Sequence, residues 1–149
     1  MAEGPMQIAF VCVRNAGRSQ LALSYTQRRL QRSGLDDAVS LVTGGTYPAD
    51  EIHTGVHEVL EAEGFELEGR TPRQITEAEL LASDIIVTMG CEDLELPDDL
   101  EADVHAWELP DPAGEPPRHV LEIAEEVDDR VRDLLADLEP RLERQPERP

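Results

Sequence analysis

Residues 7–13 form a short apolar run that leads directly into a polar turn and then into a helix-like repeat. The run, Gln-Ile-Ala-Phe-Val-Cys-Val, predicts a buried strand because its apolar residues are nearly continuous rather than alternating. Residues 14–19 are a polar turn, and apolar residues at helical spacing follow to about residue 31. We expect Ser19 to cap this helix and Gly34 to end it. A strand that turns directly into a helix is typical of α/β sheets.

Strand-like and helix-like segments alternate over the rest of the chain. We expect further strands at residues 39–43, 83–89 and 103–109, and further helices at residues 52–63, 76–81 and 117–138. Glycines 44 and 45 are expected to close the second strand, and Thr76 with Glu79 resembles a capping box. This alternation predicts one α/β domain over residues 1–149, a parallel sheet with helices on both faces. Its core is expected over about residues 7–138, with 139–149 as a polar tail.

The charge of the chain is strongly negative. Among 149 residues, 33 acidic side chains face 13 basic ones, all of them Arg, and the net charge is -20. Such a surface repels nucleic acids and anionic membranes and indicates a halophilic, salt-adapted protein. No apolar stretch is long enough to span a membrane, and the N-terminus lacks the pattern of a secretory signal. We therefore expect a cytoplasmic protein.

The segment from Cys12 to Ser19 predicts an oxyanion site. A cysteine ends the strand, five residues intervene, and Arg18 with Ser19 opens the helix. The loop can turn successive N–H groups inward, and the helix dipole adds positive potential that favours the thiolate of Cys12. Arg18 offers a planar guanidinium for two oxygens of the anion, and Ser19 can donate to the sulfur. The expected oxyanion-binding residues are Val13, Arg14, Asn15, Ala16, Gly17, Arg18 and Ser19.

Other candidate residues allow two interpretations each. Asp111, between two prolines, can be a general acid for a leaving oxygen or a structural turn residue. Cys91, just after a strand, can be a reactive thiol or a small buried side chain. His53 and His57 have helical spacing but no zinc-binding pattern, so we expect a solvated helix face and no metal. Trp107 is expected in the core or at the rim of a pocket.

These residues resemble the low-molecular-weight protein tyrosine phosphatase superfamily, and most closely its arsenate reductase branch. The resemblance runs from about residue 7 to 138 and includes the Cys12 loop with Gln20 after Arg-Ser, where the phosphatases usually have Pro. The other segments that look like the reductase branch are residues 46–50, His53, and residues 69–73, 87–91 and 107–114. The resemblance implies a three-layer sandwich around a four-stranded parallel sheet.

The resemblance also implies a mechanism. Cys12 is the nucleophile, Arg18 holds the oxyanion, Asp111 is the acid, and Cys91 is the resolving thiol. Cys12 attacks arsenate, Cys91 attacks Cys12, arsenite leaves, and a Cys12–Cys91 disulfide remains. No cofactor is bound; an external reductant, a thioredoxin-like or glutaredoxin-like protein or a low-molecular-weight thiol, restores the thiols.

The chain departs from many reductases at three positions. No cysteine follows Cys91, so a relay of three cysteines is impossible. Leu23 replaces a Glu that contributes to a potassium site in some relatives. Arg14 replaces a frequent Gly. The alternative is a phosphatase that hydrolyses phosphotyrosine or small phosphate esters through a phosphocysteine. Cys91 favours the reductase, and only Tyr47 is available as an aromatic wall for a phosphotyrosine ring.

Overall fold

The structure is a computed structural model that describes residues 5–91 and 94–143. Its sheet has four parallel strands in the order β2-β1-β3-β4. In chain order, the strands are β1 (Met6–Cys12), β2 (Val39–Gly45), β3 (Ile85–Met89) and β4 (Asp103–Ala106). The two central strands, β1 and β3, consist almost entirely of buried residues, as expected for strands covered on both faces.

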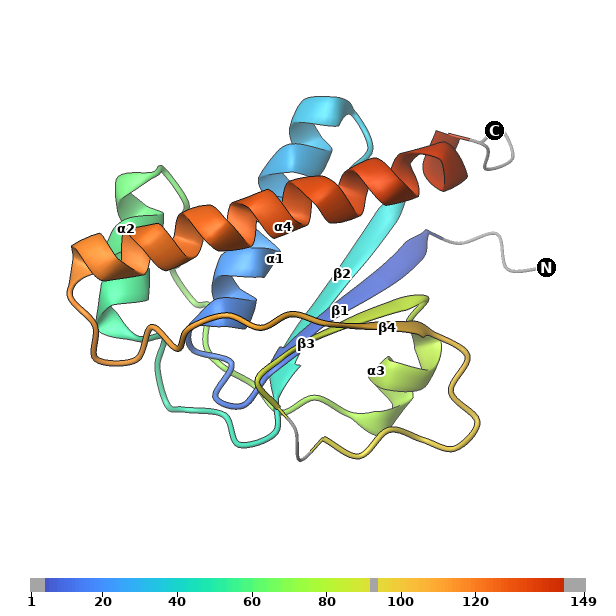
Figure 1. Ribbon diagram of the computed structural model, residues 1–149, viewed down its shortest axis with the longest axis horizontal. Coiled ribbons are helices and arrows are strands. Elements are labelled where there is room, and N and C mark those ends of the chain that lie inside the picture. Colours follow the sequence, from blue (N-terminus) through green and yellow to red (C-terminus); the bar gives the residue numbers. More distant parts are fainter. Residues whose placement is uncertain (1–4, 92–93, 144–149) are drawn as a thin grey trace.

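Helices cover both faces of this sheet (Figure 1). The helices are α1 (Arg18–Ser33), α2 (Thr54–Ala62), α3 (Glu77–Ala82) and α4 (Pro117–Glu143). The larger apolar cluster joins α1, α2 and α4 to the sheet through side chains such as Phe10 and Val87. A smaller cluster on the opposite face joins Leu80 of α3 to Ala9 and Val11. The predicted three-layer α/β fold is confirmed.

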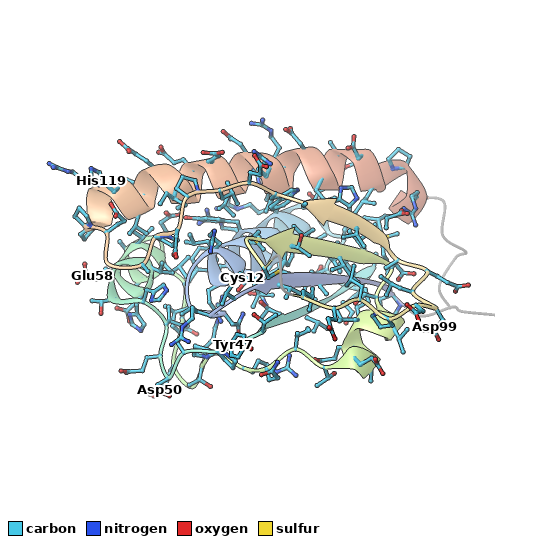
Figure 2. The ribbon with its side chains drawn as sticks, turned by 60° about the horizontal axis from the view of Figure 1, so that its bottom comes forward. Cys12, Tyr47, Asp50, Glu58, Asp99 and His119 are labelled. Atoms are coloured by element: carbon cyan, nitrogen blue, oxygen red, sulfur yellow. The ribbon has the colours of Figure 1, made fainter. Side chains whose placement is uncertain are left out.

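The register of the strands brings the segments that follow them to one edge. Cys12, the last residue of β1, pairs with Gly45 of β2 and with Met89 of β3. In parallel sheets, ligands bind beyond the carboxyl ends of the strands. The segments after β1, β2 and β3 therefore surround Cys12, which lies at the end of the sheet in Figure 2.

Two local expectations at this edge are wrong. The residue that precedes α1 is Gly17, whereas Ser19 lies inside the first turn and makes no cap. Gly44 and Gly45 do not close β2 but belong to it. They pair with Val11 and Cys12 of β1. Both are glycines because neighbouring backbone passes very close: a Cβ on Gly44 would lie 2.8 Å from the backbone of Ile75, and one on Gly45 2.5 Å from the carbonyl oxygen of Val13. The expected stop at Gly34 is confirmed by its φ of 72°.

The last helix is longer than expected. We predicted a polar tail from residue 139, but α4 continues through Pro140 to Glu143. Leu138 and Leu142 are both buried and continue the apolar face of the helix by one more turn. Residues 144–149 of the predicted tail lie outside the described residues. Within the described part of the chain, no helix is sufficiently long and apolar to cross a membrane.

Candidate active site

Cys12 is a buried free thiol with two polar neighbours at its sulfur. Its side chain is 2% exposed, its Sγ lies 2.9 Å from Oγ of Ser19, and the backbone N–H of Asn15 donates to it at 3.2 Å. Nδ2 of Asn15 donates to the same Ser19 oxygen at 2.8 Å, so the hydroxyl hydrogen of Ser19 can point to the sulfur. Donors arranged in this way suit a thiolate.

The carbonyls of residues 12–17 all accept hydrogen bonds from outside this loop. The distances are between 2.8 and 3.2 Å. For the carbonyls of residues 12 to 17 in turn, the donors are Thr46 N, Tyr47 N, Ala49 N, Gln20 Nε2, His53 N and Leu21 N. Because a trans peptide points its N–H opposite to its C=O, carbonyls that are held outward leave the N–H groups on the inner side. The loop then presents a concave set of donors at the start of α1, where the helix dipole also favours an anion.

Asn15 and Gly17 give the loop its shape for different reasons. Asn15 has a φ of 53°, in the left-handed region that Asn tolerates. Its side chain also ties the loop to its surroundings, donating to Thr43 Oγ1 at 2.9 Å and accepting from Arg73 N at 3.0 Å. Gly17 does not have a positive φ. It is required by space, because a Cβ there would lie 2.7 Å from Cγ of Pro112 and 3.1 Å from the ring of His53.

Arg18 lies against two segments that follow later strands. Its Nη1 donates to the carbonyl of Leu109 at 3.1 Å, and its Nη2 lies 4.0 Å from Oδ2 of Asp111. The guanidinium also lies over Gly90, where a Cβ would be 2.8 Å from Nη1. Asp111 itself is 59% exposed, and its Oδ1 accepts from the backbone N–H of Ala113 at 3.0 Å. Sequence reasoning proposed Arg18 and Asp111 together, and the structure brings them together.

Cys91 lies at the same edge of the sheet as Cys12 but packs on the opposite face. Cys12 belongs to the larger apolar cluster and Cys91 to the smaller one, with its Sγ 3.5 Å from the carbonyl oxygen of Val11. Cys91 is 6% exposed and lines, with Arg18, a cavity of about 480 Å³. Trp107 lines this cavity and packs against Phe10, so it serves both the core and a pocket. The sequence predicted that each cysteine lies at the end of a strand, but not that the two pack on different faces.

His53 was interpreted incorrectly from the sequence. We expected a solvated helix face, but His53 immediately precedes α2, its ring contacts Gly17, and its backbone N–H donates to the loop. Burial lowers the pKa of His53; the carboxylate of Asp111 opposes this shift, and the guanidiniums of Arg14 and Arg18 add to it. The i, i+4 histidine pattern concealed this position because only His57 lies on the helix, paired with Glu61 at 3.2 Å.

Tyr47 borders the loop, since its backbone N–H donates to the carbonyl of Val13. Tyr47 is 64% exposed on the segment after β2, outside the loop, and Figure 2 shows it below Cys12. Among residues 5–91 and 94–143, no group of three or more His, Cys, Asp or Glu side chains is placed to hold a metal ion.

Comparisons with known proteins agree with this geometry. A protein of Halobacterium salinarum, provisionally named an arsenate reductase, is 45% identical over 139 residues, which are 93% of this chain and 97% of the relative. The thioredoxin-dependent arsenate reductase of Corynebacterium glutamicum has a TM-score of 0.77 and 32% identity. That match covers 93% of this chain, but this chain spans only 64% of the corynebacterial one.

The same fold occurs in phosphatase relatives. The crystal structure of YfkJ from Bacillus subtilis matches with a TM-score of 0.80 at 20% identity, covering 95% of this chain and 99% of YfkJ. The family model described as low molecular weight phosphotyrosine protein phosphatase matches residues 7–145. A family match over nearly the whole chain, together with the loop around Cys12, shows that this protein is an enzyme of the low molecular weight phosphotyrosine protein phosphatase family.

Proposed function

We propose that this protein is an arsenate reductase that uses Cys12 as nucleophile and Cys91 as resolving thiol. One observation carries the proposal: Arg18 adjoins the Cys12 loop and also lines the cavity that Cys91 lines. A guanidinium that reaches both cysteines can hold an oxyanion beside Cys12. It can remain in contact with that oxyanion while Cys91 reacts. The relative from Halobacterium salinarum supports the same activity.

The first step forms a bond between sulfur and arsenic. The thiolate of Cys12 attacks the arsenic atom of arsenate, and one oxygen leaves as water after it receives a proton from Asp111. The loop N–H groups and Arg18 hold the remaining oxygens. Asp111 suits this role because its carboxyl group is exposed at the rim and lies 4.0 Å from the guanidinium that would hold the anion.

The second step reduces arsenic. The thiolate of Cys91 attacks Sγ of Cys12, the S–S bond forms, and the electron pair of the S–As bond stays on arsenic, which leaves as arsenite. Because Cys12 and Cys91 belong to different apolar clusters, we infer that the two sulfur atoms must come together before this attack. An external thiol then reduces the disulfide by thiol–disulfide exchange. The corynebacterial relative, which is thioredoxin-dependent, supports a protein thiol as reductant.

A phosphatase is the second candidate, and the position of Cys91 favours it. Cys12 and Cys91 belong to apolar clusters on different faces of the sheet, an arrangement that a hydrolase does not need to change. A phosphocysteine would then be released by water. The first step is nearly the same in both reactions, so the two candidates differ only in what attacks the intermediate.

The experiment that separates the two candidates follows the second cysteine. Wild-type protein is incubated with arsenate without reductant and examined by mass spectrometry for a Cys12–Cys91 bridge, which we expect. Multiple-turnover reduction of arsenate with a thioredoxin system is expected to stop in Cys91→Ala, while slow hydrolysis of an aryl phosphate continues unchanged. Two unbridged cysteines after arsenate, or normal arsenate reduction by Cys91→Ala, would leave the phosphatase as the better assignment.

A further inference from the structure

The carbonyl of Asn15 differs from the other carbonyls of the loop. Within the described part of the chain, it is the one carbonyl of residues 12–17 that a side chain holds, through Gln20 Nε2 at 2.8 Å. The other five accept from backbone N–H groups, which no substitution other than proline removes. Gln20 is 1% exposed, so water does not readily replace its amide. The orientation of the 15–16 peptide therefore depends on a side chain.

This peptide adjoins the loop residue with a left-handed backbone. Asn15 has a φ of 53°, and a rotation of the peptide after it would change ψ of Asn15 and φ of Ala16. When the carbonyl of Asn15 points to Gln20, the N–H of Ala16 points the opposite way, toward the concave side. A rotation of this peptide would replace that N–H with a carbonyl oxygen, which would repel a bound anion.

Gln20 is in turn held by Arg70, a half-buried residue from the segment before α3. Arg70 Nε donates to Oε1 of Gln20 at 2.8 Å, and its Nη2 donates to the Gln20 carbonyl at 2.9 Å and to Ser24 Oγ at 2.7 Å. Burial lowers the pKa of Arg70, but an arginine stays charged. Because a guanidinium can only donate, it fixes the oxygen of the Gln20 amide on its own side and leaves the NH₂ group for Asn15.

We propose that Gln20 and Arg70 are positioning residues of the oxyanion site. Arg70 orients the side-chain amide of Gln20, and Gln20 holds the 15–16 peptide so that the N–H of Ala16 faces the anion. This inference rests on the oxyanion site of the proposed function, but not on whether the reaction is a reduction or a hydrolysis. Neither side chain touches the substrate, and both act through the loop backbone.

Binding of inorganic phosphate tests the proposal, because phosphate occupies the site without being reduced. Calorimetric titrations are made in 1 M potassium chloride, where a Debye length of about 3 Å removes the long-range charge of Arg70. Gln20→Met is expected to weaken phosphate binding about tenfold, the equivalent of one hydrogen bond to an anion. Arg70→Met is expected to weaken it by a smaller factor. In the double variant, Arg70→Met adds nothing to the effect of Gln20→Met, because Arg70 acts through Gln20.

A matched control separates positioning from general stability. Arg29, near the other end of α1, makes an ion pair with Asp128 through bonds of 2.7 and 3.0 Å. Arg29→Met removes a comparable pair from the same helix, so it should lower the melting temperature and leave phosphate affinity unchanged. If Gln20→Met also loses only melting temperature, or if the effects of Gln20→Met and Arg70→Met simply add, the proposal is overturned.

Two further outcomes are informative. If Arg70→Met does not fold, Arg70→Lys takes its place in the cycle: it keeps the charge but not the guanidinium fork, so phosphate binding still weakens, and unchanged affinity overturns the role of Arg70. If the wild-type protein does not bind phosphate at all, the oxyanion site of the proposed function is itself wrong. Normal phosphate binding without arsenate reduction would refute the proposed reaction and leave the positioning role intact.

Discussion

The contact between Gly90 and Arg18 predicts that one methyl group disables the oxyanion site. Gly90 has a φ of 80°, so Gly90→Ala costs about 1–2 kcal/mol of folding free energy from the backbone alone. The new Cβ would lie 2.8 Å from Nη1, 3.1 Å from Nη2 and 3.2 Å from Cζ of Arg18. Because the guanidinium of Arg18 is more flexible than the backbone at residue 90, the guanidinium moves away from the new methyl group. Losing one charge-assisted hydrogen bond to the anion, about 1.5–3 kcal/mol, weakens binding about 10- to 150-fold.

The assay compares Gly90→Ala with the same substitution at a glycine that also has a positive φ but has no neighbouring atoms. Gly34 has a φ of 72° and nothing within 4 Å of its Cβ position, so Gly34→Ala has the same backbone strain without touching the site. Both variants should melt lower by about 2–8 °C, from about 2–4 °C per kcal/mol for a chain of this size. Only Gly90→Ala should lose phosphate affinity in calorimetry. Equal affinity in both variants would refute the argument that Gly90 leaves room for Arg18 to hold an anion.

The remaining predictions concern the nucleophile, the guanidinium and salt. Cys12→Ser should reduce turnover of arsenate and of aryl phosphate to background while circular dichroism and phosphate binding persist, and substantial turnover would exclude Cys12 as the nucleophile. Arg18→Lys should lower kcat/KM about 10- to 100-fold, since a single ammonium replaces a two-pronged donor; a nearly normal rate would mean that Arg18 does not hold the anion. Thermal melts and initial rates across a potassium chloride series should show stability and substrate affinity rising from dilute to molar salt, because the net charge of -20 is screened. A second salt controls for competition by chloride, and a flat melting temperature with falling affinity would contradict the salt-adapted interpretation.

The sequence predicted the fold because its signals are local and mutually consistent. The apolar run that became β1 reads as a buried strand, the amphipathic face of α4 repeats over several turns, and the capping box of Thr76 and Glu79 forms as expected. Errors occurred where a distant segment decides the outcome. Gly44 continues β2 by pairing with Val11 of β1, and its lack of a side chain leaves room for Ile75; no pattern within its own neighbourhood contains that information.

In the candidate site, too, local relations could be predicted from the sequence, and relations between distant segments could not. Cys12 and Arg18 could be found because one short loop holds both, and the loop's local geometry fixes their relation. Gln20 and Arg70 are 50 positions apart, and their hydrogen bonds exist only because the segment before α3 crosses α1. A glutamine near the start of the expected helix was the available signal, since an amide that becomes buried requires partners. With Gly17 before the helix, Gln20 is a buried residue of its first turn, and its amide reaches back to the carbonyl of Asn15 in the anion loop.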